Sequence, residues 1–460
     1  MKRSPRLIVV ANRLPLARFG AGSQARWQAG AGGLVTALLP VVRRTRGEWI
    51  GWSGAAGRAP RHEGREGVAM RPVSLSQREV ASYYHGFCNR TLWPLFHDAI
   101  RPPEFKHENW GPYVDVNMRF ARASVRCAKA GDMVWVHDYH LMLAPAMIRR
   151  LNPGLRVGFF LHIPFPPEEL FEWLPWRRAL LEGLLGADVV GFQTHLAAQN
   201  FSRLARRYTD AFGTDALLRF GGRKVVVREF PISIDFDWFD SRARGARAVR
   251  EAAAIRSRIG PRRRILLAVD RLDYTKGIDH RLEAFNRLLE RGDASVKNCV
   301  LIQVAAPSRE SVREYEEIRE KVDAMVGRIN GEHSQPGRVA VHYFRRTLSR
   351  EALVPYYLAA DVMLVTPLRD GMNLVCKEYV ASRPDLGGVL VLSEFAGAAA
   401  EMRQAMLVNP RDVSGTADAI RAAMSLPPAE ARYRMGFLRQ RVRRHDVHEW
   451  AESFLEELAP

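Results

Sequence analysis

The sequence predicts an α/β protein made of two doubly wound domains. Short apolar runs alternate with longer helical stretches along the 460 residues, which is typical of parallel sheets covered by helices. Polar residues follow directly after most of the apolar runs, and the carboxyl ends of parallel strands are where open α/β sheets bind ligands. The alternation restarts near residue 264, behind a basic stretch, so the chain divides into two halves of about equal size.

The first half begins with an apolar run at 7–11, which reads as a buried strand and is followed by Asn12 and Arg13. Further strands are expected at 49–53, 132–136, 156–161, 188–192 and 224–227, and helices at 34–39, 141–151, 168–185 and 195–208. His137, Asp138 and His140 follow one of these strands, and His162 follows the next. Polar residues therefore gather at the carboxyl ends of neighbouring strands.

Two other segments of the first half have both a functional and a plain interpretation. The glycine-rich loop at 29–33 precedes a helix, and such a loop lets backbone N–H groups approach an anion closely. Its spacing is neither GxGxxG nor that of a Walker loop, and glycine-rich loops are more often plain turns. The stretch from Ser76 to Trp93 is rich in aromatic residues, which line sugar pockets but more often form a core cluster.

The second half repeats the alternation. Strands are expected at 264–269, 300–305, 339–344, 362–365 and 388–392. Helices are expected at 239–258, 278–291, 310–329 and 372–381, and a further one follows the strand at 339–344 and ends at residue 360. We expect a first domain over 1–238 and a second over 239–440. The last segment, 441–460, is expected to form a helix that packs back on the first domain.

The stretch from 362 to 381 reads as a strand, a polar loop and a helix. The loop, 366–371, contains Arg369 and Asp370, and the expected helix begins at Met372. Unpaired N–H groups at a helix start favour a phosphate, and Glu378 is placed to accept hydrogen bonds from a ribose diol. The plain alternative is an ordinary strand–loop–helix connection with a solvated charge pair.

Composition excludes several classes of protein. The hydrophobic content of 47% and charged content of 26% are those of a globular protein, and no apolar run reaches the ~20 residues of a membrane span. The first residues lack a signal-peptide pattern, so we expect a cytoplasmic location. The four cysteines are scattered without a CxxC pair, and the histidines after the two strands lack metal-site spacing, so neither a disulfide framework nor a metal site is expected.

The formal net charge is +19, which raises the question of a nucleic-acid or membrane partner. The basic residues cluster near 43–46, 242–264 and 439–444, where solvated helix faces are the plain explanation. We find no nucleic-acid-binding motif and no alternation of basic and aromatic residues. Anionic small substrates account more simply for part of the charge, so neither nucleic acid nor membrane is expected as a partner.

Motifs spread over nearly the whole chain resemble those of the trehalose-6-phosphate synthases, a family of retaining glycosyltransferases with the GT-B fold. They are Asn12-Arg13, Gly32-Gly33-Leu34, Leu92-Trp93-Pro94, HDYHL at 137–141, FFLHIPFP at 159–166, DRLDYTKG at 270–277, TPLRDGMNLV at 366–375, KEY at 377–379, VLSEFAGAA at 391–399 and Val408-Asn409-Pro410. The resemblance implies two Rossmann-like domains facing a central cleft. It also implies transfer of glucose from a nucleotide sugar, usually UDP-glucose, to glucose 6-phosphate, without a metal or cofactor.

The resemblance assigns the donor site mainly to the second domain. Arg271 and Lys276 look like the family's clamp on the donor diphosphate, and Asp370 and His162 like its contacts to the transferred glucose. These four are the expected catalytic residues. Glu378 looks like the ribose partner. The remaining donor contacts that the resemblance implies are Gly32, Gly33, Gly371, Met372, Asn373, Leu374, Val375 and, beside the base, Leu348.

For the acceptor, Arg13 and Arg309 look like the family's phosphate-binding pair, and a guanidinium suits a phosphomonoester. Tyr84 and Asp138 are expected to bind the same sugar, and Trp93 to shape its pocket. In the family, retention is thought to proceed by front-side attack, with the leaving phosphate oxygen taking the acceptor's proton. Asp138 and Asp370 are therefore expected to bind substrate and not to act as nucleophiles.

Several points stay open at the level of the sequence. Leu348 stands where some members have Phe, so donors with guanine or adenine compete with UDP-glucose. The segment at 14–29 has no assigned role, and a homo-oligomer is compatible with everything above. We expect a separate phosphatase to act on the product. Three alternatives remain, namely transfer to another phosphorylated acceptor such as glycerol 3-phosphate, a non-catalytic regulatory relative, and a basic nucleic-acid-binding protein.

Overall fold

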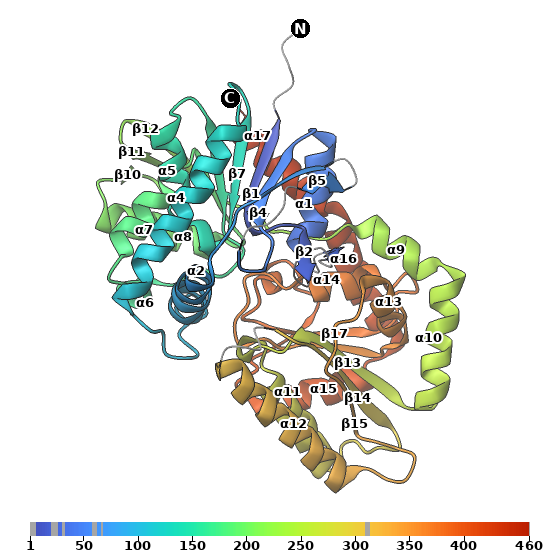
Figure 1. Ribbon diagram of the computed structural model, residues 1–460. Coiled ribbons are helices and arrows are strands. Elements are labelled where there is room, and N and C mark those ends of the chain that lie inside the picture. The colour runs from blue at the N-terminus through green and yellow to red at the C-terminus, as the bar shows by residue number, and fades with distance from the viewer. Residues whose placement is uncertain are drawn as a thin grey trace. The chain divides into compact units, whose positions relative to one another are not determined.

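The computed structural model describes residues 6–19, 26–29, 33–57, 62–65, 68–308 and 313–459. The chain forms two compact units, the first made of Met1–Ile232 with His448–Pro460 and the second of Ser233–Val447 (Figure 1). Each unit is built around a largely or wholly parallel sheet with helices on it, so the predicted α/β class is confirmed. Among the described helices, none combines the length and apolar character needed to cross a bilayer.

The first unit contains a ten-stranded sheet in the order β10-β11-β12-β9-β8-β7-β1-β4-β6-β5. The strands from β12 to β6 are parallel, whereas β10, β11 and β5 pair antiparallel at the two edges. Its strands are β1 (Leu7–Arg13), β4 (Glu48–Trp52), β5 (His62–Arg65), β6 (Val68–Pro72), β7 (Met133–His137), β8 (Arg156–Phe160), β9 (Val189–Phe192), β10 (Phe212–Gly213), β11 (Leu217–Phe220) and β12 (Arg223–Glu229). A separate hairpin is formed by β2 (Leu16–Phe19) and β3 (Arg26–Ala29).

The helices of the first unit connect these strands. They are α1 (Gly33–Arg44), α2 (Gln77–Glu79), α3 (Trp93–Phe96), α4 (Trp110–Cys127), α5 (Ala144–Leu151), α6 (Glu168–Phe171), α7 (Arg177–Leu184), α8 (His195–Tyr208) and α17 (Val447–Leu458), with short 3₁₀ turns at His107–Asn109 and Tyr139–Leu141. The helix predicted over 168–185 is in fact two helices, because Pro175 lies between them and cannot donate a helical hydrogen bond. The aromatic stretch forms a π-helix at Val80–Leu92, a form usually seen in short pieces near functional sites.

The second unit contains a six-stranded parallel sheet in the order β15-β14-β13-β16-β17-β18, the order of dinucleotide-binding folds. Its strands are β13 (Arg264–Arg271), β14 (Cys299–Ala306), β15 (Val341–Phe344), β16 (Val362–Val365), β17 (Val389–Ser393) and β18 (Met406–Val408). Its helices are α9 (Phe236–Arg244), α10 (Ala246–Ile259), α11 (Ile278–Glu290), α12 (Arg313–His333), α13 (Arg350–Ala359), α14 (Leu374–Ala381), α15 (Val413–Ser425) and α16 (Pro428–Arg444), with 3₁₀ turns at Tyr274–Lys276 and Gly397–Ala400.

Element boundaries differ from the predictions in three instructive places. The expected helix at 239–258 breaks at Gly245, which has extended backbone and ends α9 while preceding α10. The units divide after Ile232 instead of after residue 238, because α9 starts at Phe236 and Asp235 caps it within the second unit. The final helix returns to the first unit from His448 and not from 441, because α16 continues to Arg444 in the second unit.

The C-terminal helix α17 completes the core of the first unit. Phe454 is fully buried and stacks on Trp135 of β7, with ring centroids 4.2 Å apart and planes 9° apart. Two strand glycines make room for this ring. A Cβ on Gly158 or Gly191 would come within 2.6 Å or 2.8 Å of its carbons.

Replacing Phe454 should therefore destabilise the protein strongly. We expect Phe454→Ala to lower the free energy of unfolding by about 3–5 kcal/mol, because a fully buried aromatic ring leaves a cavity. Phe437→Ala is the matched control, since Phe437 is 44% exposed and its loss should cost under about 1 kcal/mol. Urea denaturation of both variants measures the difference, and equal losses would contradict the packing of α17 described above.

Candidate active site

In the second unit, the loops after β13 and β16 meet at the point where the strand order reverses. β13 pairs with β14 on one side and with β16 on the other, so its carboxyl end is a topological switch point. The two loops are joined by a hydrogen bond of 2.8 Å from the N–H of Leu368 to the carbonyl of Thr275. Ligands of doubly wound sheets bind at this position. The predicted DRLDYTKG and TPLRDGMNLV motifs form these two loops.

Lys276 and Asp370, one from each loop, are directly paired. The Lys276 Nζ lies 2.6 Å from Oδ2 of Asp370, and Nδ2 of Asn373 donates to the same oxygen at 3.1 Å. The sequence placed all three at one site without indicating that they contact each other. The pairing holds the Lys276 ammonium at the mouth of the β16 loop, and the side chains of both charged residues are largely buried.

Arg271, the last residue of β13, has an exposed side chain that lies 3.8 Å from Asp273. Asp273 is fully buried and accepts hydrogen bonds from the N–H and hydroxyl of Thr275 and from the hydroxyl of Tyr315. The 3₁₀ turn at 274–276 therefore begins at a fixed Asp cap, which sets the direction in which Lys276 leaves it. Asp273 belongs to the recognised motif, but its supporting role was not predicted.

Arg281 of α11 ties the ends of three strands together from beneath the site. Its guanidinium is completely buried and bonds to Asp270 at 2.5 Å, to Gln303 at 2.9 Å and to the hydroxyl of Thr366 at 2.9 Å. It also reaches the carbonyl of Lys276 at 3.4 Å. Sequence reasoning missed this residue. The available signal was an arginine among Ile278, Leu282 and Phe285 on the apolar face of a helix.

The helix start after Asp370 differs from the prediction. We expected the helix from Met372, but α14 begins at Leu374, with Asn373 as its cap. The Asn373 side chain accepts from the N–H of Cys376 at 3.2 Å, and its backbone has φ of 84°, a conformation that non-glycine residues rarely adopt. Leu374 and Val375 are thus the first helical residues, and their N–H groups head the helix. Gly371 packs against Gly397. A Cβ on Gly397 would lie 1.9 Å from the carbonyl oxygen of Gly371.

Glu378 lies one turn into α14 and is held by Tyr357 of α13. The Tyr357 hydroxyl donates to Oε2 of Glu378 at 2.8 Å. Burial raises the pKa of Glu378, although the hydrogen bond from Tyr357 and the charge of Arg350 oppose that shift. Leu348 is half-buried just before Ser349, the residue that caps α13. Leu348, the predicted contact to the base, therefore lies just before α13. Glu378, the predicted contact to the ribose, lies beside the last turn of that helix.

In the first unit, Arg13 lies at the end of β1 over two aromatic rings. Its guanidinium carbon is 4.1 Å from the centroid of Trp52 and 5.3 Å from that of Tyr84. Gly54 has φ of 94°, and a Cβ there would lie 1.9 Å from Nη1 of Arg13. The structure thus brings together Arg13 and Tyr84, as predicted for one site. Trp52 and Gly54, which support the guanidinium, were not predicted.

Asp138 and its neighbours continue the cluster. Tyr84 stacks on His140 with centroids 5.8 Å apart, and Nδ1 of His140 lies 3.7 Å from Oδ2 of Asp138. The Oδ1 of Asp138 accepts from the backbone N–H of His162 at 3.3 Å. Asp138 has φ of 74°, so this residue also occupies a rarely populated conformation. Backbone strain of that kind is common at functional sites.

Two further residues complete this group. Trp93 follows the π-helix, is 5% exposed and packs on His97 and Tyr139 with centroids 4.1 Å and 5.7 Å apart. Asn117 of α4 is fully buried and holds the 138–144 loop by donating to the carbonyl of His140 and accepting from the N–H groups of Leu143 and Ala144. Asn117 was not predicted, because an isolated Asn in a helix carries no recognisable signal.

The ring of His162 also contacts His137, at the end of β7. The Nδ1 of His137 and Nε2 of His162 are 3.1 Å apart. Burial lowers the pKa of His137 well below its usual range and that of His162 to about 3, so both rings are neutral at neutral pH.

Some predicted residues lie outside the described part of the chain. Gly32 and Arg309 are among them, as is much of the segment at 14–29, and α1 begins at Gly33. Within the described residues, no group of three or more His, Cys, Asp or Glu side chains is arranged to hold a metal ion.

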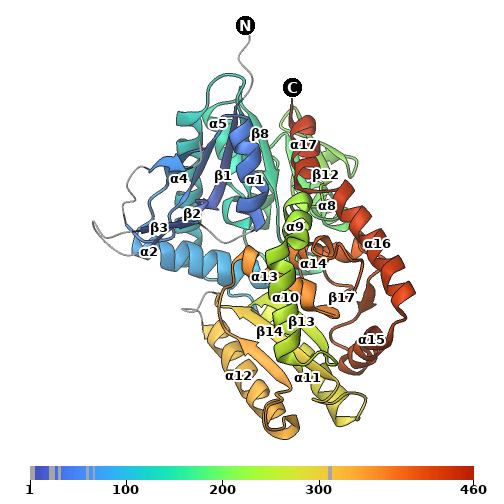
Figure 2. The ribbon, with the colours of Figure 1, turned by 90° about the vertical axis from the view of Figure 1, so that its right-hand side faces the viewer.

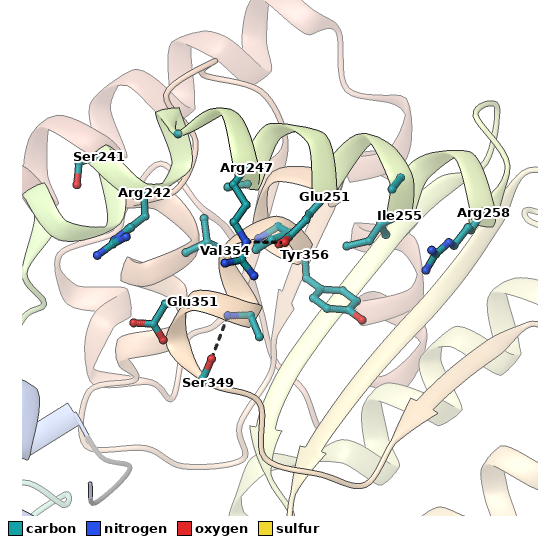
Figure 3. Close-up of a pocket in the computed structure, with 15 residues that line it drawn as sticks. Ser241, Arg242, Arg247, Glu251, Ile255, Arg258, Ser349, Glu351, Val354 and Tyr356 are labelled. Atoms are coloured by element: carbon teal, nitrogen blue, oxygen red, sulfur yellow. Dashed lines mark hydrogen bonds and ion pairs between the residues drawn. The ribbon is translucent and has the colours of Figure 1, made fainter.

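Elsewhere in the second unit, α10 and α13 lie side by side (Figure 2). A surface hollow of about 630 Å³ is lined by residues of both helices. Figure 3 shows side chains of both helices around it, with Arg247 paired to Glu251 at 2.8 Å. None of the sequence-predicted site residues lines this hollow. Its walls carry arginine and glutamate side chains together, so no single charge dominates, and we assign it no part in the site.

Comparison with known proteins identifies the relatives of this chain. The model of "Glycosyltransferase family 20" matches residues 5–460. Trehalose-6-phosphate synthase of Mycolicibacterium gilvum is 52% identical over 471 residues, covering 98% of this chain and 93% of that protein. The enzyme of the same name from Mycolicibacterium smegmatis is 53% identical over 464 residues, covering 98% of this chain and 92% of that protein.

Solved structures agree over the whole fold. A Burkholderia xenovorans α,α-trehalose-phosphate synthase (UDP-forming), in complex with glucose-6-phosphate, has a TM-score of 0.90 and 33% identity and covers 99% of this chain and 100% of its own. An E. coli structure described as bound with UDP-2-fluoro glucose has a TM-score of 0.91 and 34% identity, and covers 99% of each chain.

Arg281 gives the sharpest test of how the second-unit site is built. We expect Arg281→Met to lower the free energy of unfolding by about 3–5 kcal/mol, because the buried carboxylate of Asp270 loses its cation. Arg291→Met is the control, since Arg291 pairs with Asp418 at the surface and should cost under about 1 kcal/mol. Adding Asp270→Asn to Arg281→Met should recover part of the loss in urea denaturation. A double variant no more stable than the single one would contradict the assigned pairing.

Proposed function

The chain belongs to glycosyltransferase family 20 and is a glycosyltransferase, and we propose on that premise that it transfers glucose from UDP-glucose to glucose 6-phosphate. The product is α,α-trehalose 6-phosphate, formed with retention of configuration at the transferred carbon, and UDP is released. The observation that carries the proposal is the pairing of Lys276 with Asp370 near Arg271, at the switch point of a sheet with the strand order of dinucleotide-binding folds. Names of similar proteins support it, since several are called UDP-forming trehalose-phosphate synthases.

The donor is proposed to bind on the second unit. Arg271 and Lys276 take the diphosphate, and the N–H groups of Leu374 and Val375 at the start of α14 add their partial positive charge. Glu378 accepts hydrogen bonds from the ribose hydroxyls, while the hydroxyl of Tyr357 donates to its Oε2. The UDP-2-fluoro glucose named with the E. coli relative supports uracil as the base.

The acceptor is proposed to bind on the first unit. Of the two residues predicted to bind the acceptor phosphate, Arg13 lies within the described residues, and its guanidinium lies over the rings of Trp52 and Tyr84. Such preorganisation suits a phosphomonoester, which offers several oxygens to one planar fork. Asp138 accepts from a sugar hydroxyl and Trp93 shapes the pocket. We retain Arg309 as the second phosphate ligand on the basis of the motif alone.

The chemistry follows from charge placement. As the bond between glucose and UDP breaks, its electron pair passes to the diphosphate oxygen, and Arg271, Lys276 and the α14 N–H groups stabilise that charge. The attacking hydroxyl of glucose 6-phosphate approaches on the same face and transfers its proton to the departing phosphate oxygen. No carboxylate serves as nucleophile. Asp370 instead positions Lys276 and binds the transferred sugar, so catalysis consists of positioning and electrostatic stabilisation.

One incubation series tests the activity. The protein is mixed with UDP-, GDP- or ADP-glucose and with glucose 6-phosphate or glycerol 3-phosphate, with and without EDTA, and products are identified by mass and linkage. We expect an α,α-1,1-linked disaccharide phosphate from UDP-glucose and glucose 6-phosphate, undiminished by EDTA. A faster reaction with glycerol 3-phosphate would change the acceptor, and loss of activity that Mg²⁺ restores would assign the leaving-group charge to a metal. Salt-sensitive retention on DNA without transfer would favour the nucleic-acid alternative.

Lys276 should matter for turnover more than for acceptor binding. We expect Lys276→Ala to lower kcat by about 10²–10³, the usual effect of removing a group that stabilises transition-state charge, with a KM for glucose 6-phosphate within about threefold of wild type. Lys297→Ala is the control, because Lys297 is an exposed lysine away from the loops of the site. Steady-state kinetics at saturating donor gives both constants. Unchanged turnover would remove Lys276 from the mechanism.

Glu378 predicts a pH dependence of donor binding. Because burial raises its pKa above 4.5, Glu378 gains a proton at a higher pH than an exposed glutamate, and a protonated carboxyl is a poorer acceptor for ribose hydroxyls. We therefore expect the affinity for UDP-glucose to fall as the pH is lowered from about 7 towards 5. Glu378→Gln should bind more weakly at neutral pH but lose this dependence. Calorimetric titration with UDP-glucose at several pH values measures the affinity of wild type and of Glu378→Gln. Parallel pH profiles for the two would refute the role of Glu378 in binding the ribose.

A further inference from the structure

The hydrogen bond between His137 and His162 has a direction that the surroundings determine. His137 ends β7 and His162 follows β8, and these strands are parallel neighbours. The two facing nitrogens, Nδ1 of His137 and Nε2 of His162, are 3.1 Å apart. Both rings are neutral at neutral pH, so each carries a single N–H. One ring must therefore donate and the other accept.

The far nitrogen of His137 decides which ring donates. His137 is fully buried, and its Nε2 has no hydrogen-bond partner among the described residues. The aromatic neighbours of the ring, Trp135 with centroids 4.7 Å away and Phe160 at 6.4 Å, offer an indole N–H and carbon atoms but no acceptor oxygen. An N–H at Nε2 would be a buried donor without an acceptor, and such groups are rare because they are costly. The proton of His137 therefore belongs on Nδ1.

We propose that His137 is a positioning residue: it donates its Nδ1–H to Nε2 of His162 and so holds His162 in the tautomer with its proton on Nδ1. The ring of His162 is half-buried, and no described residue hydrogen-bonds to its Nδ1. That nitrogen is then a fixed donor. The backbone of His162 is held separately by Asp138, so both the position and the tautomer of the ring are set within the first unit.

The consequence for the substrate rests on the proposed function. A histidine locked as an Nδ1–H donor binds an oxygen lone pair and cannot accept from a hydroxyl proton. It therefore selects a transferred sugar with a hydroxyl at its far end, at carbon 4 or carbon 6, and discriminates against a sugar lacking it. With the other tautomer, Nδ1 would present a lone pair, and the same hydroxyl would have to rotate and donate.

Spectroscopy of the intact protein tests the tautomer directly. Long-range ¹H–¹⁵N correlation spectra of histidine-labelled protein distinguish protonated from bare ring nitrogens, and the signals of His162 are assigned by their loss in His162→Gln. We expect His162 to carry its proton on Nδ1 in the wild type. His137→Asn, whose amide N–H replaces Nδ1–H, should preserve this tautomer, whereas His137→Leu should shift His162 toward the Nε2–H form. A wild-type His162 protonated on Nε2, or a tautomer unchanged in His137→Leu, would overturn the proposal.

Kinetics then tests the consequence with donor analogues. We expect His137→Leu to lower kcat/KM for UDP-glucose about tenfold, and His137→Asn to stay within about threefold of wild type. The same comparison is made with UDP-4-deoxyglucose and with UDP-6-deoxyglucose. With the analogue that lacks the hydroxyl contacted by His162, wild type and His137→Leu should have equal, low values of kcat/KM. Two results together would show a merely structural role and overturn the proposal. They are an equal loss of kcat/KM in His137→Asn and His137→Leu, and a tenfold difference between wild type and His137→Leu that persists with both deoxy donors. Absence of glucosyl transfer by the wild type would refute the proposed function, while the spectra would still decide the tautomer.

Discussion

The second-unit site depends on one buried cation. Arg281 lies under the switch point without exposure to solvent and bonds to Asp270 of β13, Gln303 of β14 and Thr366 after β16. Three strand ends that are distant in the sequence are thereby held in one register, and the carbonyl of Lys276 is held with them. The guanidinium suits this task because its planar donors reach several acceptors in fixed directions. Lys276 and Asp370 are therefore held by a support that lies beneath them.

Both clusters contain a non-glycine residue at positive φ. Asp138 in the first unit and Asn373 in the second have φ of 74° and 84°. Each uses its side chain locally, Asp138 to accept from the His162 backbone and Asn373 to cap α14. Positive φ is uncommon for non-glycine residues and costs free energy that surrounding bonds must offset. The hydrogen bonds of Asp138 and Asn373 therefore stabilise these unusual backbone positions locally.

The large positive charge has a structural part that composition does not reveal. Several arginines of the second unit are buried and donate to backbone carbonyls at helix ends. Arg383 donates to the carbonyls of Tyr357, Leu358 and Ala360 at the C-terminal end of α13. Arg439 donates to those of Val380 and Ala381 at the end of α14. Cations stabilise helix C-termini, where carbonyls lack partners and the dipole is negative. These two helices carry Tyr357 and Glu378, so part of the charge supports the site indirectly.

The sequence by itself determined the α/β class and most strand positions, because buried parallel strands are continuous apolar runs. Its motifs also indicated some members of each cluster, among them Lys276 and Asp370 in the second unit and Arg13 and Tyr84 in the first. It did not determine that Lys276 contacts Asp370, that Arg281 lies beneath them, or that Trp52 and Gly54 support Arg13. Those contacts join residues far apart in the chain, and only the register of neighbouring strands brings them within bonding distance. The start of α14 was also decided by tertiary structure, since Asn373 caps the helix from a conformation that propensity alone does not predict. The direction of the His137–His162 bond likewise depends on burial, which leaves one ring nitrogen without an acceptor.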